Sequence, residues 1–197
     1  MKIGVVCSRY DGTPLDTSLE YVGVDHGIDY LYEMGIKPTV AIGDFDSLKH
    51  QEILENLDTI TLPTIKDETD LEAAIMYLED NRFTDITVYG TTGGRLDHFM
   101  AVISILAKYP ELKIKVIDKQ NKIQLLNTGR TKIYKNNYKY FSLFALENTN
   151  ISISGAAYQL DNYLLRVEDP LCVSNQIKDE YAIIENNKNI ILIQSND

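Results

Sequence analysis

The chain has 197 residues, of which 44% are hydrophobic and 24% are charged, and its formal net charge at pH 7 is −10. This length suits one large domain or two small ones, and it is enough to bury a core. The acidic balance leaves no basic field that could recruit phosphates, so it excludes a general nucleic-acid-binding protein and a protein that binds anionic membranes.

The two cysteines, Cys7 and Cys172, lie far apart in the sequence, each in an apolar setting. This arrangement fits neither a disulfide framework nor a zinc site, so we expect two reduced thiols in a cytoplasmic protein. The apolar run at the N-terminus is too short for a signal peptide. No apolar run approaches the ~20 residues that span a bilayer, so we also expect no membrane partner.

Strands and helices are predicted to alternate over roughly the first 120 residues. The strands are short apolar runs, whereas the helices carry apolar residues at helical spacing. Such alternation predicts parallel strands joined by right-handed crossovers, in an open, mostly parallel α/β sheet whose ligand site lies at the carboxyl ends of the strands. The predicted strands are residues 3–7, 21–24, 40–42, 59–62, 86–89 and 114–117, and the predicted helices are residues 26–34, 49–57, 71–78 and 96–107.

After about residue 120 the helical spacing disappears and short β-prone runs follow one another, which predicts an antiparallel all-β sandwich or barrel. We therefore predict two domains, an α/β domain at residues 1–122 and a β-sandwich domain at residues 123–197. The strands predicted in the second domain are residues 123–126, 131–134, 140–144, 150–153, 163–167, 181–184 and 190–193.

Two carboxylates follow the strand at residues 40–42. In an extended chain Asp44 and Asp46 point to the same side and Phe45 points to the other. Two unpaired carboxylates held together are costly, and Mg²⁺ removes that cost while binding phosphate oxygens. Gly43 allows another group to approach the backbone closely. By itself this segment, which ends at Ser47, fits a metal–phosphate site and a polar turn that caps the next helix equally well.

The acidic segment at residues 66–70, which begins with Lys66, precedes the helix predicted at residues 71–78. Thr69 and Glu72 have the spacing of a capping box. Acidic residues also complement the helix dipole, which accounts for the segment without any ligand. As an alternative, Asp70 supplies a third acid that completes a Mg²⁺ site better than two acids from one strand.

The loop at residues 90–98, Gly-Thr-Thr-Gly-Gly-Arg-Leu-Asp-His, lies between a predicted strand and a predicted helix. Glycines allow backbone N–H groups to converge on an anion, and the positive end of the following helix adds to the attraction. Arg95 can hold phosphate oxygens in a fork. The spacing is not that of a P-loop. The alternative is a tight strand-to-helix turn in which Asp97 and His98 cap the helix.

In this order and spacing, Asp25 and the segments at residues 43–47, 67–70 and 90–98 resemble the thiamine pyrophosphokinase family. The resemblance implies an α/β catalytic domain joined to a β-sandwich, Mg²⁺ as the cofactor, and ATP and thiamine as substrates. It implies a transferase, or kinase, that moves the terminal diphosphate of ATP to the thiamine hydroxyl and releases AMP. It also implies a homodimer in which thiamine binds between the α/β half of one subunit and the β half of the other.

The resemblance also implies a role for each matching residue. Asp44, Asp46 and Asp70 match metal and diphosphate ligands, and together with Asp97 they form the implied catalytic set. The chain departs from the family where Ala156 and Ala157 precede Tyr158, and where residues 7–10 replace a glycine-rich turn. The implied ATP contacts are Thr91, Thr92, Gly93, Gly94, Arg95 and His98, and the implied thiamine contacts are Asp25, Asp97, Tyr158, Ser174 and Asn175.

Two other classes of function compete with this interpretation. An Asp-x-Asp motif after an apolar strand is also typical of haloacid-dehalogenase-type phosphatases, in which the first Asp is the nucleophile. Those enzymes place the motif on their first strand, and they leave the loop at residues 90–98 without a role. The second alternative is a non-catalytic thiamine or nucleotide sensor on the same scaffold, although a sensor would not need every acid.

Overall fold

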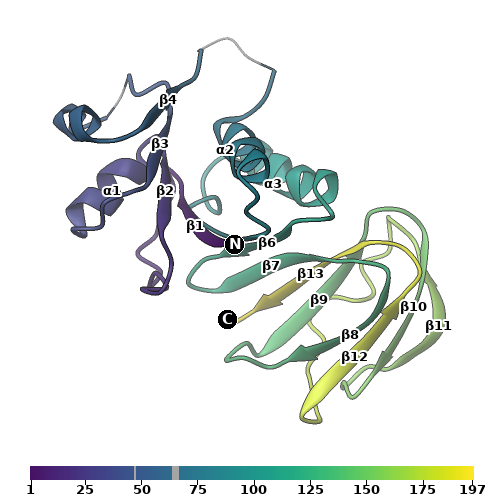
Figure 1. The fold of residues 1–197 in the computed structure, drawn as a ribbon. Coiled ribbons are helices and arrows are strands. Elements are labelled where there is room, and N and C mark those ends of the chain that lie inside the picture. The colour runs from purple at the N-terminus through teal and green to yellow at the C-terminus, as the bar shows by residue number, and fades with distance from the viewer. Residues whose placement is uncertain (47, 64–66) are drawn as a thin grey trace. The chain divides into compact units, whose positions relative to one another are not determined.

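The computed structural model describes residues 1–46, 48–63 and 67–197 (Figure 1). Ser47 and Lys66, which belong to two of the predicted motifs, lie outside the described residues. The chain divides into two compact units. The first unit comprises Met1–Ile105 and Glu111–Lys119, and the second comprises Leu106–Pro110 and Gln120–Asp197.

The first unit contains six parallel strands, as the alternation of elements predicts. They lie side by side in the order β4-β3-β2-β1-β5-β6, and each neighbouring pair is parallel. Every residue of β2 and β3 is buried, as expected for strands covered on both faces. The strands are β1 (Lys2–Val6), β2 (Tyr21–Val24), β3 (Val40–Gly43), β4 (Thr59–Thr61), β5 (Asp85–Tyr89) and β6 (Lys113–Ile117).

Helices cover this sheet from both sides. Helix α1 (Gly27–Glu33) lies on one face, and α2 (Asp70–Asp80) and α3 (Leu96–Lys108) lie on the other (Figure 1). The first turns of α2 and α3 follow the loops at the carboxyl ends of β4 and β5, at the edge where an open α/β sheet carries its ligand site. Within the described part of the chain, no helix combines the length and apolar character needed to cross a membrane.

The helix predicted at residues 49–57 is instead the 3₁₀ helix η1 (Gln51–Asn56). His50 precedes it with φ −117° and ψ 66°, which is not helical, and Leu57 follows it in an extended conformation. The backbone N–H groups of Lys49 and His50 already donate to the buried carboxylate of Asp29. The helix has six residues before the chain extends again at Leu57, and short helical segments of this kind commonly adopt 3₁₀ geometry.

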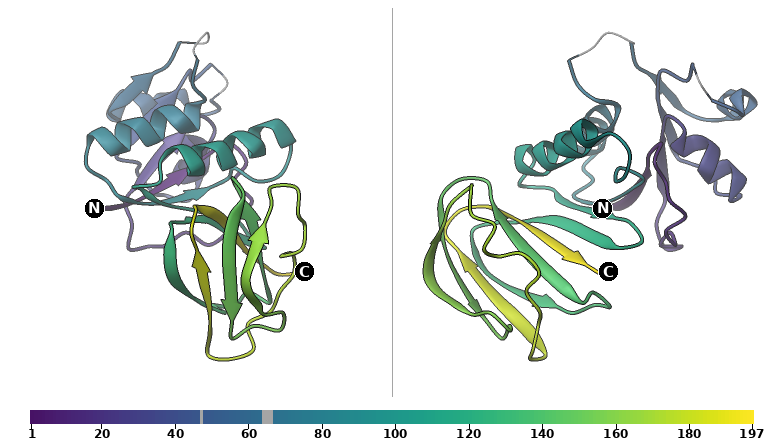
Figure 2. Two further views of the ribbon diagram at one scale, coloured as in Figure 1. Left: turned by 90° about the vertical axis from the view of Figure 1, so that its right-hand side faces the viewer. Right: turned by 180° about the vertical axis from the view of Figure 1, so that it is seen from behind.

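The second unit is the predicted antiparallel β-sandwich. In one layer the strands lie side by side in the order β7-β13-β9, and the other layer is a sheet with the order β11-β10-β12-β8. Figure 2 shows the strands of this unit from two further sides. Phe141 and Leu143 of the first sheet belong to one apolar core with Ile151 and Ile184 of the second. The strands are β7 (Asn121–Leu126), β8 (Gly129–Tyr134), β9 (Tyr140–Ala145), β10 (Thr149–Ser154), β11 (Leu160–Leu165), β12 (Tyr181–Asn186) and β13 (Ile190–Ser195).

Strand β11 begins earlier than the predicted strand at residues 163–167 and ends earlier as well. Its N-terminal part contains Asn162, whose φ is 44°, and the pairing with β10 shifts register between Ile151 and Ile153. Such an irregular segment hides the alternation that marks a strand. At the other end, the carboxylate of Asp169 accepts the N–H of Arg166, so the chain turns there.

Candidate active site

A pocket of about 380 Å³ opens in the first unit at the carboxyl ends of β1, β2 and β5, beside the first turns of α2 and α3. It contains acids from two loops and basic side chains from two others. It therefore occupies the edge of the sheet at which the sequence predicts a ligand site. Its polar lining residues are Ser8, Arg9, Asp25, Glu68, Thr69, Asp70, Thr91, Arg95 and His98.

Asp25 lies against the start of the two-carboxylate segment. Its N–H donates to the carbonyl of Ile42 at 3.0 Å, and a Cβ atom at Gly43 would overlap its Oδ1 atom. The close approach that Gly43 permits is therefore that of the Asp25 carboxylate. Asp25 has a φ of 48°, in the left-handed region that few side chains adopt, so the surrounding structure holds this residue in a strained conformation.

The backbone between Asp44 and Asp46 turns and does not extend the strand. Strand β3 ends at Gly43, and Phe45 has a φ of 60°. The N–H of Asp46 donates to Oδ1 of Asp44 at 3.3 Å. The alternation that would point both carboxylates to one face is therefore wrong for these residues, because strand geometry has already stopped. A local side-chain-to-backbone turn brings Asp44 to the backbone of Asp46 instead.

The structure does not place the three predicted metal ligands around one point. Asp70 lines the pocket, but Asp44 and Asp46 do not. Across residues 1–46, 48–63 and 67–197, no three His, Cys, Asp or Glu side chains gather closely enough to hold a metal ion. Asp44 is half-buried and Asp46 is exposed, so both carboxylates remain accessible.

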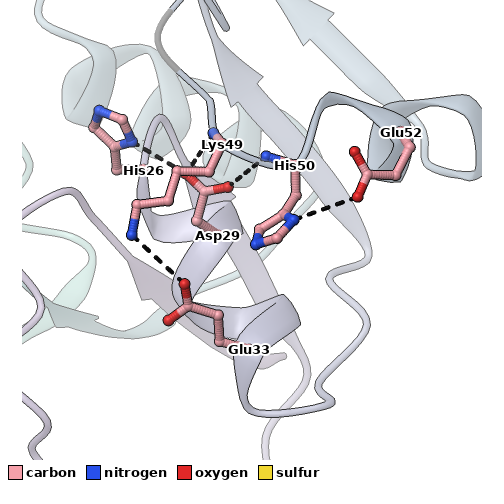
Figure 3. Close-up of polar contacts among 6 residues, drawn as sticks. All are labelled: His26, Asp29, Glu33, Lys49, His50 and Glu52. Carbon is pink, nitrogen blue, oxygen red and sulfur yellow. Dashed lines mark hydrogen bonds and ion pairs between the residues drawn. The ribbon is translucent and has the colours of Figure 1, made fainter.

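Asp29, on α1, anchors the chain just beyond the Asp44–Asp46 turn (Figure 3). Asp29 is buried, with 2% of its surface exposed. Its carboxylate accepts the N–H groups of Lys49 at 3.3 Å and His50 at 3.1 Å. Nδ1 of His26 lies 3.1 Å from the same carboxylate. Burial alone would raise the pKa of Asp29, but the hydrogen bonds from His26 and the two backbone N–H groups outweigh burial and lower it.

The start of α2 carries the predicted cap. The hydroxyl of Thr69 accepts the N–H of Glu72 at 3.2 Å, and the helix begins at Asp70. Thr69 therefore acts as the helix cap, while Asp70 lies in the first turn and Glu68 just before it. Both acids line the pocket. The capping interpretation and the site interpretation of this segment are thus compatible, because different residues serve the two purposes.

The loop after β5 is held tightly at its start and is open farther along. Gly90 has a φ of 77°, and a Cβ atom there would lie 2.5 Å from the carbonyl oxygen of Cys7. Only glycine fits this approach. The Thr91 hydroxyl is buried, and it has no hydrogen-bond partner among the described residues. A buried hydroxyl without a partner costs free energy, so this atom is suited to a polar group that a ligand brings.

Arg95 and Asp97 are paired with each other at the start of α3. Arg95 donates from Nε to Oδ1 at 3.1 Å and from Nη2 to Oδ2 at 2.5 Å, and both side chains are exposed. The N–H of His98 also donates to Oδ1 of Asp97. The hydrogen bond from Arg95 is the main reason that the pKa of Asp97 is lowered. Arg95 and His98 line the pocket, but Asp97 does not.

The thiol of Cys7 lies at the buried end of the pocket and is not a nucleophile. Burial raises its pKa strongly, and the negative charges of Asp25 and Asp70 raise it further. Only the thiolate attacks in nucleophilic catalysis, so a thiol that stays protonated has no such role. Three acids and two arginines line the pocket, so its formal charge is negative when His98 is counted as neutral.

The predicted residues of the second unit form a separate group. Tyr158 is 72% exposed, and Ser174 is exposed with a φ of 61°. Asn175 is buried, and its amide binds the backbone of Tyr158 on both sides. Its Oδ1 accepts the Tyr158 N–H at 3.0 Å, and its Nδ2 donates to the Tyr158 carbonyl at 2.7 Å. Asn175 therefore fixes the position of Tyr158 and has little capacity left for another partner.

Some pocket residues did not emerge from the sequence motifs. The structure adds Ser8 and Arg9, which follow β1. It also brings in Glu68, which belongs to the acidic segment at residues 66–70 but had no role assigned. Arg9 could have been found, because the carboxyl end of a central parallel strand is the expected place for ligand-binding residues. Among the predicted residues, Asp25, Asp70, Thr91, Gly93, Arg95 and His98 line the pocket, whereas Asp44, Asp46, Thr92, Gly94 and Asp97 are absent from its lining.

Both parts of the chain match family models. The thiamin pyrophosphokinase catalytic domain matches residues 15–117, and the thiamin pyrophosphokinase vitamin B1 binding domain matches residues 130–191. A thiamine pyrophosphokinase of Bacillus subtilis is 34% identical over 189 residues, which cover 90% of this chain and 87% of the relative. A thiamin pyrophosphokinase of Caenorhabditis elegans is 25% identical over 167 residues, which cover 78% of this chain and 68% of the relative.

Solved structures agree with the sequence comparisons. The crystal structure of thiamine pyrophosphokinase from Bacillus subtilis superimposes with a TM-score of 0.91 at 31% identity, covering 100% of both chains. That of thiamin pyrophosphokinase from Geobacillus thermodenitrificans has a TM-score of 0.87 at 28% identity, covering 100% of this chain and 98% of the other. The similarity thus extends over both compact units.

Proposed function

Because the chain belongs to the thiamine pyrophosphokinase family, we propose that it transfers the terminal diphosphate of ATP to the hydroxyl of thiamine. The products are thiamine diphosphate and AMP. The chain is an enzyme of the thiamine diphosphokinase class. The observation that carries the detailed proposal is the pocket that gathers acids, a partnerless hydroxyl and basic side chains at the carboxyl ends of three strands.

Mg²⁺ is the proposed cofactor, and the acids are its proposed ligands. Carboxylate oxygens are the donors that Mg²⁺ prefers, and it commonly takes one or two of them together with phosphate oxygens and water. Asp44, Asp46 and Asp70 would hold it. The ion would supply positive charge to the phosphate oxygens. Since the described residues do not gather three acids around one point, the substrate's oxygens would have to complete the shell.

The loop after β5 is the proposed phosphate site. The buried hydroxyl of Thr91 lacks a partner among the described residues, and a phosphate oxygen would satisfy it. Arg95 would bind other phosphate oxygens in a fork. We assign the remaining ATP contacts to Thr92, Gly93, Gly94 and His98, which lie in the same loop or in the first turn of α3.

Asp97 is proposed to orient the thiamine hydroxyl or accept its proton. In the structure its pKa is lowered by Arg95, so it is a weak base while that pair is intact. If Arg95 turns to the phosphate, it releases the Asp97 carboxylate, which then becomes a better proton acceptor. Binding of ATP would thereby prepare the residue that acts on the second substrate.

Thiamine is a cation, and the negative inner pocket favours it. Asp25 and Asp97 are the proposed acidic contacts. In the second unit, exposed Tyr158 would offer an aromatic face and Ser174 a hydroxyl, while Asn175 would hold Tyr158 in place. We propose a homodimer that joins the two kinds of contact, which sedimentation can check. A cytoplasmic location fits the two free, buried cysteines.

The proposed activity is tested by incubating the protein with ATP, Mg²⁺ and thiamine. We expect equal amounts of AMP and thiamine diphosphate. Release of inorganic phosphate with a phosphorylated Asp44 would instead support the phosphatase alternative. Binding of both substrates with no product would support the sensor. Neither alternative has a counterpart in the family matches, which cover both parts of the chain.

A further inference from the structure

The loop after β1 brings a second arginine to the pocket. Arg9 is exposed and lines the pocket together with Arg95 and His98. Strand β1 lies between β2 and β5 and runs parallel to both. The loop that carries Arg9 therefore leaves the sheet at the same edge as Asp25 and the loop at residues 90–95. The topology places a permanent positive charge at the centre of the candidate site.

The backbone of Arg9 is fixed by the loop after β5. Its N–H donates to the carbonyl of Gly90 at 2.9 Å, and the N–H of Cys7 donates to the carbonyl of Tyr89 at 2.9 Å. A Cβ atom at Gly90 would lie 2.6 Å from the nitrogen of Tyr10, so the two loops pack backbone against backbone. The starting point of the Arg9 side chain is thus determined by hydrogen bonds that need no acidic partner.

The guanidinium of Arg9 lies over the glycine turn and is left uncommitted. A Cβ atom at Gly94 would be 3.1 Å from its Cζ and 3.2 Å from its Nε. Among the described residues, no carboxylate or other side chain forms an ion pair or hydrogen bond with it. Arg95 differs, because Asp97 occupies two of its donors. Of the two arginines in the pocket, Arg9 is the one whose donors are available without breaking an ion pair.

The negative charge of the pocket has to be offset before it can bind a polyphosphate, and Arg9 supplies positive charge there. Asp25, Glu68 and Asp70 line it, and the protein as a whole carries −10. A nucleoside triphosphate brings further negative charge, which such a pocket would repel without nearby cations. An arginine fork matches phosphate oxygens in geometry as well as in charge.

We propose that Arg9 is a nucleotide-binding residue that donates hydrogen bonds to the polyphosphate of ATP from the side of β1. This assignment rests on the proposed function, and it adds a residue that the sequence motifs did not include. Arg9 and Arg95 then approach the triphosphate from the ends of neighbouring strands. Arg9 binds with donors that are free beforehand, whereas Arg95 must first leave Asp97.

The test is direct binding of an ATP analogue with a methylene group between the α and β phosphorus atoms, in the presence of Mg²⁺. Calorimetry compares the wild-type protein with Arg9→Gln and Arg9→Lys. Loss of charged hydrogen bonds predicts a Kd about 10- to 100-fold higher in Arg9→Gln, with part of the affinity kept in Arg9→Lys. Adenosine, which lacks phosphates, should bind all three proteins equally.

Arg82→Gln is the matched control. This substitution removes the same charge as Arg9→Gln. Arg82 is exposed and precedes β5, at the end of the strand remote from the pocket. Its Kd for the analogue should equal that of the wild type. An Arg9→Gln variant that binds the analogue within twofold of wild type, or that loses adenosine affinity equally, overturns the assignment.

The assignment and the proposed activity can fail separately. Wild-type turnover combined with unchanged binding in Arg9→Gln removes Arg9 and leaves the activity. Weakened binding in Arg9→Gln combined with no AMP or thiamine diphosphate from the wild type keeps Arg9 and removes the activity. An unchanged thermal unfolding midpoint in Arg9→Gln would show that the variant is folded, so that its lower affinity does not come from unfolding.

Discussion

The two units of the chain hold their candidate functional residues in opposite ways. In the first unit the side chains of Arg9 and Asp46 and the hydroxyl of Thr91 are left open among the described residues, although Arg95 and Asp97 pair with each other. In the second unit the hydrogen-bonding groups of a buried side chain are already occupied, because the amide of Asn175 binds the backbone of exposed Tyr158. A site that binds charge needs uncommitted donors and acceptors, whereas a platform that presents an aromatic ring needs a rigid support.

Strained backbone occurs in both units, at residues of interest. Asp25 and Phe45 in the first unit and Ser174 in the second have φ values of 48°, 60° and 61°. Such conformations persist only where the surroundings over-determine them. In the first unit they turn the chain at the ends of β2 and β3, and in the second they lie beside the residue that supports Tyr158. The comparison predicts that substituting an open side chain of the first unit changes activity with little effect on stability, and that substituting the supporting residue Asn175 of the second unit lowers stability.

The largest effect is expected for Asp46→Asn. Asp46 is exposed, and only its backbone N–H takes part in the turn, so the fold should be retained within about 0.5 kcal/mol. Loss of a direct metal ligand should lower turnover by more than about 100-fold, since even indirect partners of metal ligands cost 10- to 100-fold. Production of AMP and thiamine diphosphate measures the first quantity, and urea unfolding measures the second.

Asp80→Asn is the control for that variant. Asp80 is also exposed and lies at the last residue of α2, away from the pocket lining. It should leave turnover unchanged. Near-normal activity in Asp46→Asn would show that Asp46 is not a metal ligand. It would also contradict the view that open side chains of the first unit serve activity.

The next effect is a loss of stability in Asn175→Ala. The substitution leaves the N–H and carbonyl of Tyr158 without their partner, which should cost about 1–3 kcal/mol of unfolding free energy. The control is Gln159→Ala, at the exposed position that follows Tyr158, which should cost less than about 0.5 kcal/mol of unfolding free energy. Urea titration compares the two. Equal stability of both variants would show that Asn175 does not support Tyr158 in the way the geometry indicates.

Asp29→Asn should make a smaller, pH-dependent difference in the first unit. The folded-state pKa of Asp29 lies below the unfolded value of about 3.9, so its stabilisation is fully present above about pH 4. It is lost as the pH falls through the lower folded-state pKa. We expect the variant to be about 1 kcal/mol less stable than wild type at pH 7, with a smaller gap at pH 3. A gap that is independent of pH would contradict the assigned hydrogen bonds.

The smallest effect concerns the thiols, which should behave alike in the two units. Burial, helped by Asp169, raises the pKa of Cys172 to about 11, and burial also raises that of Cys7. At pH 8 only about 0.1% of Cys172 would be thiolate, so a thiol-alkylating reagent should not label the native protein. Both cysteines should react in urea. Labelling of Cys172 in the native protein, detected by mass spectrometry, would contradict this.

The sequence by itself determined the fold class and the candidate acids. Alternating apolar runs predicted the parallel sheet, short β-prone runs predicted the sandwich, and both are present because hydrophobic periodicity is a local property. The spacing of Asp25, Asp44 and Asp70 with the loop at residues 90–98 indicated the family, which the comparisons then showed. The Thr69 cap was also predictable, since it depends on residues three positions apart.

Only the tertiary structure decided what each side chain is free to do. The sequence could not show that Gly43 makes room for Asp25, that Asp29 accepts the backbone N–H groups just before η1, or that Asn175 binds the backbone of Tyr158. Nor could it show that Asp97 occupies Arg95 while Arg9 stays available in the pocket. These facts depend on contacts between segments that are distant in sequence or on the choice between competing partners, and local patterns carry no information about either.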